Sequence, residues 1–136
     1  MTEAPRFRRF TPERRSAMLV QAGIACLARG GLAAFTIDKI AGEAGVSRGL
    51  IAHHFGGKDG LLAAVHAEAY RGFLDILAPD GAEPSLRDVL DRAFSAELFN
   101  RDTLKIWLAL WGEISVNPAL RDEHRRRYDA YLDHVE

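Results

Sequence analysis

A chain of 136 residues, 48% of them hydrophobic and 27% charged, suits one compact domain or two small ones. Its single cysteine, Cys26, excludes an internal disulfide, and without a signal-like segment or an apolar run near the roughly 20 residues that span a bilayer we expect a cytoplasmic protein. The net charge of −1 divides into +4 for residues 1–60 (nine Lys or Arg against five Asp or Glu) and −5 for residues 61–136 (nine against fourteen), which is typical of a polyanion-binding module joined to a part that does not touch the polyanion.

Residues 1–10 show no helical periodicity, and their basic and aromatic side chains alternate. This pattern predicts a flexible basic arm that reaches a phosphate or the minor groove of DNA. The alternative is a disordered terminus in which Phe10 packs on the first helix. That helix begins after the N-cap Thr11 and ends at Gly30-Gly31.

Two short helices and a tight turn follow. Thr36 caps the first of them, Gly45 suits the left-handed residue at its end, and Ser47 is a good N-cap for a helix that runs to Phe55. Two short helices joined in this way form a helix-turn-helix, whose second helix reads the major groove. An ordinary corner in a helical bundle has the same local pattern.

The rest of the chain also reads as helices. A fourth helix is predicted from Lys58-Asp59 to about Leu77, and a fifth from Ser85, which forms a capping box with Asp88 and has an apolar side that reaches Glu97. A sixth opens near Thr103 and is apolar on nearly all sides, which predicts a buried helix. The seventh starts at Asn117-Pro118 and reaches Glu136 in mid-pattern, so we expect the natural protein to continue. With no alternating strand pattern, the predicted fold class is all-α.

Three short motifs lie in order within residues 18–62: Thr36-Ile37-x-x-Ile40-Ala41, then Ala44-Gly45-Val46-Ser47-Arg48-Gly49, then His53-His54-Phe55 with Lys58 and Leu61-Leu62. Together they resemble the N-terminal domain of TetR/AcrR-type transcriptional regulators. Ala52, Gly60 and the aromatic segment 107–111, followed by Pro118-x-Leu120 and Arg126-Arg127, favour the BetI-like, choline-responsive subgroup of that family.

The resemblance implies three parts: a flexible basic arm (1–10), a helix-turn-helix DNA-binding domain (11–57) and a helical effector-binding and dimerisation domain (58–136) that is incomplete at its C-terminal end. It also implies a homodimeric repressor that binds a palindromic double-stranded DNA operator and is released by a small-molecule effector. The implied DNA contacts are Thr36, Ser47, Arg48, Gly49, Ala52, His53, His54 and Lys58.

Each contact has a chemical role and some have an alternative. Arg48 would reach a guanine edge, Gly49 would let the backbone approach the groove, and His53 would touch a base or a phosphate. The remaining polar residues of the set would hold phosphates. His54 has the alternative of a histidine at the edge of the core, and Ala52 departs from the aromatic residue that many relatives carry.

Six aromatic residues are candidates for the effector site: Tyr70, Phe94, Phe99, Trp107, Trp111 and Tyr128. Aromatic rings around a cavity can bind a quaternary ammonium such as choline, although the two tryptophans can equally be core filler. We expect no cofactor, metal or enzymatic activity, because neither the histidines nor Cys26 has a ligand spacing such as His-Glu-x-x-His. A rival to the repressor is a helical adaptor of the same fold that has lost DNA binding, against which the retained Arg48 and Lys58 speak.

Overall fold

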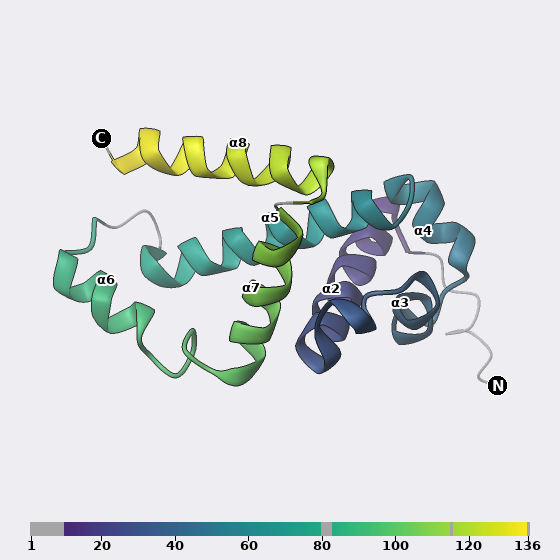
Figure 1. Cartoon of the computed structure of the whole chain (residues 1–136), viewed down its shortest axis with the longest axis horizontal. Helices are drawn as coiled ribbons and strands as arrows, with labels where there is room; N and C mark the ends of the chain where they lie inside the picture. Colours follow the sequence, from purple (N-terminus) through teal and green to yellow (C-terminus); the bar gives the residue numbers. More distant parts are fainter. Residues whose placement is uncertain (1–9, 80–82, 115, 136) are drawn as a thin grey trace.

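The computed structural model describes residues 10–79, 83–114 and 116–135, and it confirms the all-α prediction for them. The helices are α2 (Pro12–Gly30), η1 (Gly31–Ala34), α3 (Ile37–Ala44), α4 (Arg48–Phe55), α5 (Lys58–Leu77), α6 (Leu86–Ala93), α7 (Arg101–Ile114) and α8 (Pro118–Val135). In Figure 1, α5 runs from the α2–α4 group across the molecule, and α8 lies alongside it. Residues 1–9, on which most of the predicted basic arm falls, lie outside the described residues.

The helix boundaries follow the local signals in the sequence. Thr11 and Thr36 each accept a hydrogen bond of 3.2 Å from the backbone N–H three residues later. Ser85 and Asp88 form the predicted capping box, with both reciprocal hydrogen bonds at 3.2 Å. Gly45 adopts the left-handed conformation at φ 71° that ends α3. Where such a signal is present, the sequence therefore places the helix end to within a residue or two.

The core joins the first three helices to the start of α5. Its fully buried side chains come from α2, α3, α4 and α5, with single contributions from the loop before α3, α7 and α8: Leu19, Cys26, Leu27, Phe35, Ile40, Ile51, Leu61, Leu62, Val65, Leu110 and Leu120. Gly23 brings α2 close to α5, since a Cβ there would lie 2.8 Å from Val65. α4 is thus fixed on a rigid base.

One expectation about membranes needs correction. From the sequence we expect no apolar run long enough to span a bilayer. The helical segment Pro12–Ala34 does have the length and the composition of such a run. Its apolar residues Leu19 and Leu27 are fully buried, and the helix packs against α3, α5 and α7. A core helix can have the same length and composition as a membrane span, so these two features alone do not indicate a span.

The prediction of a buried sixth helix is wrong for the described residues. Only Leu110 of α7 is buried, whereas Leu108 and Trp111 are 66% and 56% exposed. α7 packs with one side against α2, η1 and α8, and its other apolar side is left outward. An apolar stripe indicates that a face can be buried, but burial requires a neighbour on that side.

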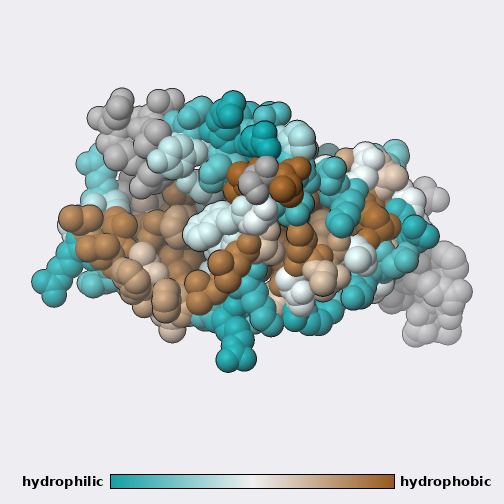
Figure 2. Space-filling view, viewed as in Figure 1, coloured by the Kyte–Doolittle hydropathy of each residue, from teal (hydrophilic) through white to brown (hydrophobic). Residues whose placement is uncertain are grey.

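The predicted fifth helix is also shorter than expected. α6 ends at Ala93 and does not reach Glu97, and none of its residues is buried. Figure 2 shows hydrophobic side chains gathered over α6 and along the path to α7. α7 begins at Arg101, two residues before Thr103, because Asn100 caps it by accepting from the Thr103 N–H at 2.9 Å.

Candidate nucleic-acid interface

The turn between α3 and α4 is held by backbone hydrogen bonds and by the core. The Val46 N–H donates to the Ala41 carbonyl at 3.0 Å, which together with the left-handed Gly45 forms a Schellman-type helix end. Val46 packs against the core, and Ile51 of α4 is fully buried. Both contacts fix which face of α4 points away from the molecule.

The outward face of α4 carries four of the predicted contact residues, all exposed: Arg48, Gly49, Ala52 and His53. A Cβ at Gly49 would meet nothing within 4 Å, so packing inside this chain does not require glycine there. Glycine in a helix costs roughly 0.5–1 kcal/mol relative to alanine. Glycine at this position is therefore better explained by a binding partner that comes close to the backbone of α4.

A surface hollow of about 370 Å³ lies beside this face. The N-terminal residues of three helices, α3, α4 and α5, line it. It is lined by residues from α3, α4, the α4–α5 junction and α5: Ile37, Arg48, Gly49, Ala52, Gly57 and Lys58. The N-cap residues of α4 and α5 make no side-chain capping hydrogen bond. Unsatisfied N–H groups together with two cationic side chains favour an anion such as a phosphate.

Two small polar residues flank the same surface. Ser47 is exposed and has the extended backbone of an N-cap, but its hydroxyl does not take the capping hydrogen bond that the sequence predicts. Thr36 does cap α3 by accepting from the Lys39 N–H. The Thr36 hydroxyl can still donate its proton outward, because capping uses it only as an acceptor.

His54 is the predicted contact residue that faces inward. Its Nδ1 shares a 3.2 Å hydrogen bond with the Ser16 hydroxyl of α2, and its Nε2 is buried. The neighbouring His53 is exposed and packs edge-to-face on it, with ring centroids 5.1 Å apart. The structure thus places His54 between α4 and α2, in agreement with the core-edge alternative.

Arg48 has an acidic neighbour across the turn. Its Nε lies 2.9 Å from Asp38 Oδ1, and the two side chains are 71% and 73% exposed. A second pair, Arg29 with Glu43 at 2.6 Å, links α2 to the other end of α3. The sequence reasoning did not find either pair, because both depend on the angles between helices.

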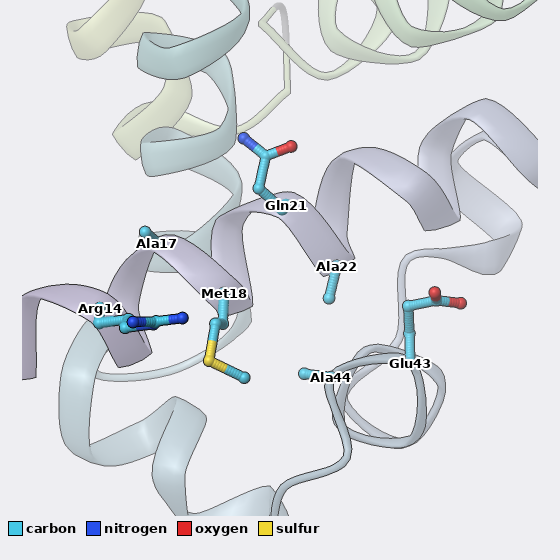
Figure 3. Close-up of a pocket in the computed structure, with 7 residues that line it drawn as sticks. All are labelled: Arg14, Ala17, Met18, Gln21, Ala22, Glu43 and Ala44. Carbon is cyan, nitrogen blue, oxygen red and sulfur yellow. The ribbon is translucent and has the colours of Figure 1, made fainter. Parts of the chain in front are cut away.

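A larger hollow of about 490 Å³ lies between α2 and α3, away from the predicted contacts. In Figure 3, Met18 of α2 points toward Ala44 of α3, with Arg14 and Glu43 among the lining residues. The Arg14 guanidinium also lies 4.7 Å from the centroid of the Phe10 ring, so Phe10 packs on the start of α2. None of the predicted DNA-contact residues lines this hollow.

The candidate effector residues divide into two groups. Trp107 lies at the centre of a ring cluster, with centroids 6.0 Å from Tyr70 and 5.9 Å from Trp111. Tyr128 joins the same cluster by stacking on His124, whose ring lies 5.5 Å from that of His66. Phe94 and Phe99 instead pair with each other at 5.7 Å, and both are more than half exposed.

Sequence reasoning missed three members of this cluster. His66 and Phe73 pack edge-to-face on Trp107 at 6.2 and 5.9 Å, and His124 links them to α8. His66 and Phe73 lie four residues before and three residues after Tyr70, so helical spacing on α5 could have found them. His124 lies four residues before Tyr128 on α8, so the same spacing could have found it as well, whereas its contact with His66 of α5 could not be predicted locally.

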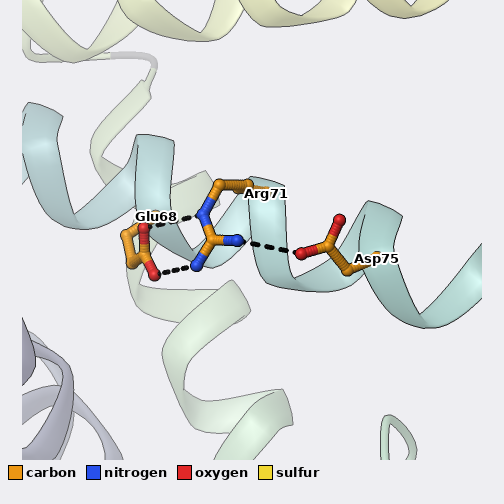
Figure 4. Close-up of polar contacts among 3 residues, drawn as sticks. All are labelled: Glu68, Arg71 and Asp75. Atoms are coloured by element: carbon orange, nitrogen blue, oxygen red, sulfur yellow. Dashed lines mark hydrogen bonds and ion pairs between the residues drawn. The ribbon is translucent and has the colours of Figure 1, made fainter. Parts of the chain in front are cut away.

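The other ion pairs of the described residues join side chains three or four residues apart on one helix. On α5, Arg71 donates from Nε to Glu68 at 3.0 Å and from Nη1 to Asp75 at 2.9 Å (Figure 4). The hydrogen bond from Arg71 lowers the pKa of the Glu68 carboxyl below its usual value. Burial raises the pKa of the Cys26 thiol, which keeps it protonated and unsuited to act as a nucleophile.

Comparison with protein families accounts for this arrangement. Residues 19–65 match the family of bacterial regulatory proteins named tetR, and residues 82–136 match the C-terminal part of BetI-type transcriptional repressors. The chain belongs to the TetR family. Because its relatives are named as transcriptional regulators, TetR-family membership also sets the enzyme hypothesis aside.

Individual TetR-family relatives agree with both matches. The BetI regulator of Vibrio parahaemolyticus is 35% identical over 131 residues, which cover 91% of this chain and 66% of the relative. BetI 1 of Chromohalobacter salexigens is 35% identical over 113 residues, or 79% of this chain and 56% of the relative. The chain thus spans between about half and two thirds of the length of these curated TetR-family relatives.

Solved structures of transcriptional regulators have the same fold. A transcriptional regulator from Pseudomonas aeruginosa PAO1 is 42% identical, with a TM-score of 0.69 over 93% of this chain and 64% of that one. A regulator from Saccharomonospora viridis, solved in complex with choline, is 25% identical, with a TM-score of 0.70 over 89% of this chain and 66% of that one.

Proposed function

We propose that the chain is the DNA-binding and effector-sensing part of a ligand-responsive transcriptional repressor that acts in the cytoplasm. The observation that carries this proposal is the exposed face of α4, which places Arg48, Gly49 and His53 beside the cationic hollow at Lys58. A helix of this size that is braced on one side and polar on the other fits the major groove. Residues 11–57 form the DNA-binding domain in this proposal, and residues 58–136 belong to the effector-binding and dimerisation domain.

The contacts divide by chemistry. Arg48 reads a guanine edge, Gly49 and Ala52 allow close approach of the backbone, and His53 touches a base or a phosphate. Ser47, Thr36 and Lys58 hold phosphates and set the register of α4 in the groove. His54 acts indirectly through its hydrogen bond to Ser16, which fixes α4 against α2.

A homodimer would present two copies of α4 to one duplex. Two recognition helices about 34–36 Å apart meet successive major grooves on one side of B-DNA, and their two-fold symmetry matches a palindromic operator. Dimerisation would add the two half-site energies and raise specificity over a single module. This step rests on the family relation rather than on a contact within this chain.

The effector part of the proposal rests on the aromatic cluster around Trp107. A choline-like quaternary ammonium is attracted to ring faces, and Trp111 remains 56% exposed beside the cluster. An effector that binds better to a dimer with the wrong helix spacing draws population away from DNA. The alternative, that Trp107 only fills the core, is favoured by its edge-to-face contacts with Tyr70 and Phe73.

The test compares two cationic residues with different roles. Arg48→Ala should weaken binding to a preferred duplex by about 1–3 kcal/mol and relax the base preference. Lys58→Ala should weaken all duplexes alike and reduce the slope of log K against log salt by about 1, because one phosphate contact is lost. Fluorescence anisotropy with a duplex selected from a random library, at two salt concentrations, measures both effects.

Two outcomes would contradict the proposal. If the wild-type chain shows no salt-dependent binding to random duplex DNA, the adaptor of the same fold is the better description. An Arg48→Ala chain that binds with unchanged base preference would remove α4 as the reading helix. Circular dichroism of each variant shows that the helices remain intact.

A further inference from the structure

The ion pair between Asp38 and Arg48 joins the first turns of the two helices in the helix-turn-helix. Asp38 is the second residue of α3 and Arg48 the first of α4, and Arg48 Nε lies 2.9 Å from Asp38 Oδ1. Exposed pairs of this kind contribute little to folding stability because solvent screens them. Since both side chains are more than two thirds exposed, the fold alone does not explain the pair.

A carboxylate at this position opposes binding of a polyanion. Asp38 directly follows Ile37, which lines the hollow with Arg48 and Lys58. A negative charge here repels nearby phosphates and cancels part of the attraction of the two cations. An acidic side chain in the first turn of α3 also interacts favourably with the positive end of the helix dipole, which explains a carboxylate at this position. It does not explain why the carboxylate pairs with Arg48 of the next helix.

The geometry of the Asp38–Arg48 ion pair suggests a role in binding. A guanidinium presents five N–H donors in a planar fork, and the ion pair with Asp38 is closest at Nε, 2.9 Å from Oδ1. A contact at Nε leaves the edge formed by the two terminal nitrogens available to pair with two acceptors. A guanine offers two acceptors, O6 and N7, at the spacing of such a pair.

We propose that Asp38 is a positioning residue that holds the Arg48 guanidinium in the orientation that reads guanine. Asp38 touches no base itself. It restricts a long, flexible side chain before binding, so that Arg48 loses less freedom when it meets its base and fits other bases less well. This proposal rests on the proposed function, in which α4 lies in the major groove.

The test measures base discrimination in the full chain. A duplex selected by the wild type from a random library is compared with versions in which each G·C pair is changed in turn. Asp38→Ala should reduce the strongest guanine preference about fivefold or more. Binding to random duplex should stay equal or become tighter, because a repulsive charge is removed.

A matched control comes from the other end of the same helix. Glu43 is a carboxylate on α3 that pairs with Arg29 of α2 at 2.6 Å, away from the hollow around Arg48. Glu43→Ala removes the same charge and also breaks an ion pair, yet it should leave base preference unchanged. Asp38→Glu, which keeps the carboxylate, should recover part of the guanine preference, whereas Asp38→Asn should recover less.

A double-mutant cycle separates this proposal from the proposed function. In the Arg48→Ala background, Asp38→Ala should have no further effect on discrimination, because the two residues act as one unit. Unchanged guanine preference in Asp38→Ala, with a normal loss in Arg48→Ala, overturns the positioning role and leaves α4 as the reader. Tighter binding to the selected duplex with its preference intact also overturns the proposal, since Asp38 would then compete with DNA for Arg48. No loss of preference in Arg48→Ala overturns both.

Discussion

At the scale of a single residue, Gly49 is expected to lower the stability of α4 and to favour binding of DNA. A Cβ at this position meets nothing within 4 Å in the free chain, so Gly49→Ala should stabilise folding by roughly 0.5–1 kcal/mol. In the complex the added methyl would press on the groove wall, and close-packed contacts of this kind cost about 1–3 kcal/mol. We therefore expect a more stable protein that binds duplex DNA more weakly, measured by thermal unfolding and anisotropy.

Gly72 provides the control for that prediction. It lies within α5, and a Cβ there also meets nothing within 4 Å. Gly72→Ala should raise the melting temperature in the same way but leave the affinity for DNA unchanged. Equal binding by the two variants would show that the backbone of α4 does not come close to the duplex.

At this scale the sequence predicts which face of α4 is exposed, but not the contacts of every side chain on that helix. The motif correctly indicates that Arg48, Gly49, Ala52 and His53 are exposed together, because helical spacing around the buried Ile51 determines their side. It does not decide between the two directions of His54, which depend on Ser16 from another helix. The sequence does not predict the ion pair of Arg48 with Asp38 either, because it too depends on how two helices pack.

At the scale of an element, Asn117 links the start of α8 to the start of α5. Its Oδ1 accepts from the Leu120 N–H at 3.2 Å, which caps α8, and its Nδ2 donates to Asp59 Oδ1 at 3.0 Å. The side chain is 6% exposed. Asn117→Ala should therefore lower the free energy of unfolding by about 2 kcal/mol, since a cap and a hydrogen bond to a charged group are both lost.

Asn100 is the matched residue for this comparison. It caps α7 through Thr103, and its Nδ2 donates only to the Ala96 and Glu97 carbonyls of the preceding turn. Asn100→Ala should cost about 1 kcal/mol, because the two hydrogen bonds of Nδ2 are exposed to solvent and the cap accounts for most of the loss. Urea unfolding of both variants measures the difference, and equal losses would mean that the bond to Asp59 contributes nothing.

Helix ends could be predicted from the sequence, whereas helix neighbours could not. Capping residues act within one turn, so Thr36, Gly45 and Ser85 mark their boundaries locally. Burial of α6 and α7 depends on what lies against them. Exposed Leu86 and Leu108 show that an apolar stripe does not by itself provide a partner.

At the scale of the whole molecule, α5 connects the proposed DNA surface to the aromatic cluster. Lys58 at its first turn lines the hollow beside α4, and Tyr70 farther along contacts Trp107. The core at Leu61 and Val65 lies between them and is fully buried, so the helix can transmit a displacement as a rigid element. If the proposed effector site is correct, a ligand at the cluster would alter the position of α4 through this helix.

Thermodynamic linkage turns this arrangement into a measurement. If choline weakens DNA binding by some factor, DNA must weaken choline binding by the same factor, and such factors are typically about 5–150. Trp107 and Trp111 are the only tryptophans in the chain and both belong to the cluster, so tryptophan emission follows the ligand. We expect the factor by which saturating duplex lowers the choline affinity, measured by emission, to equal the factor by which saturating choline lowers the DNA affinity, measured by anisotropy.

The uncharged isostere 3,3-dimethylbutanol should bind far less, because cation–π attraction requires the charge. A change in emission with no change in DNA affinity would show that the cluster binds choline without regulating DNA binding. Equal binding of the isostere would show that cation–π attraction to Trp107 and Trp111 does not select the ligand.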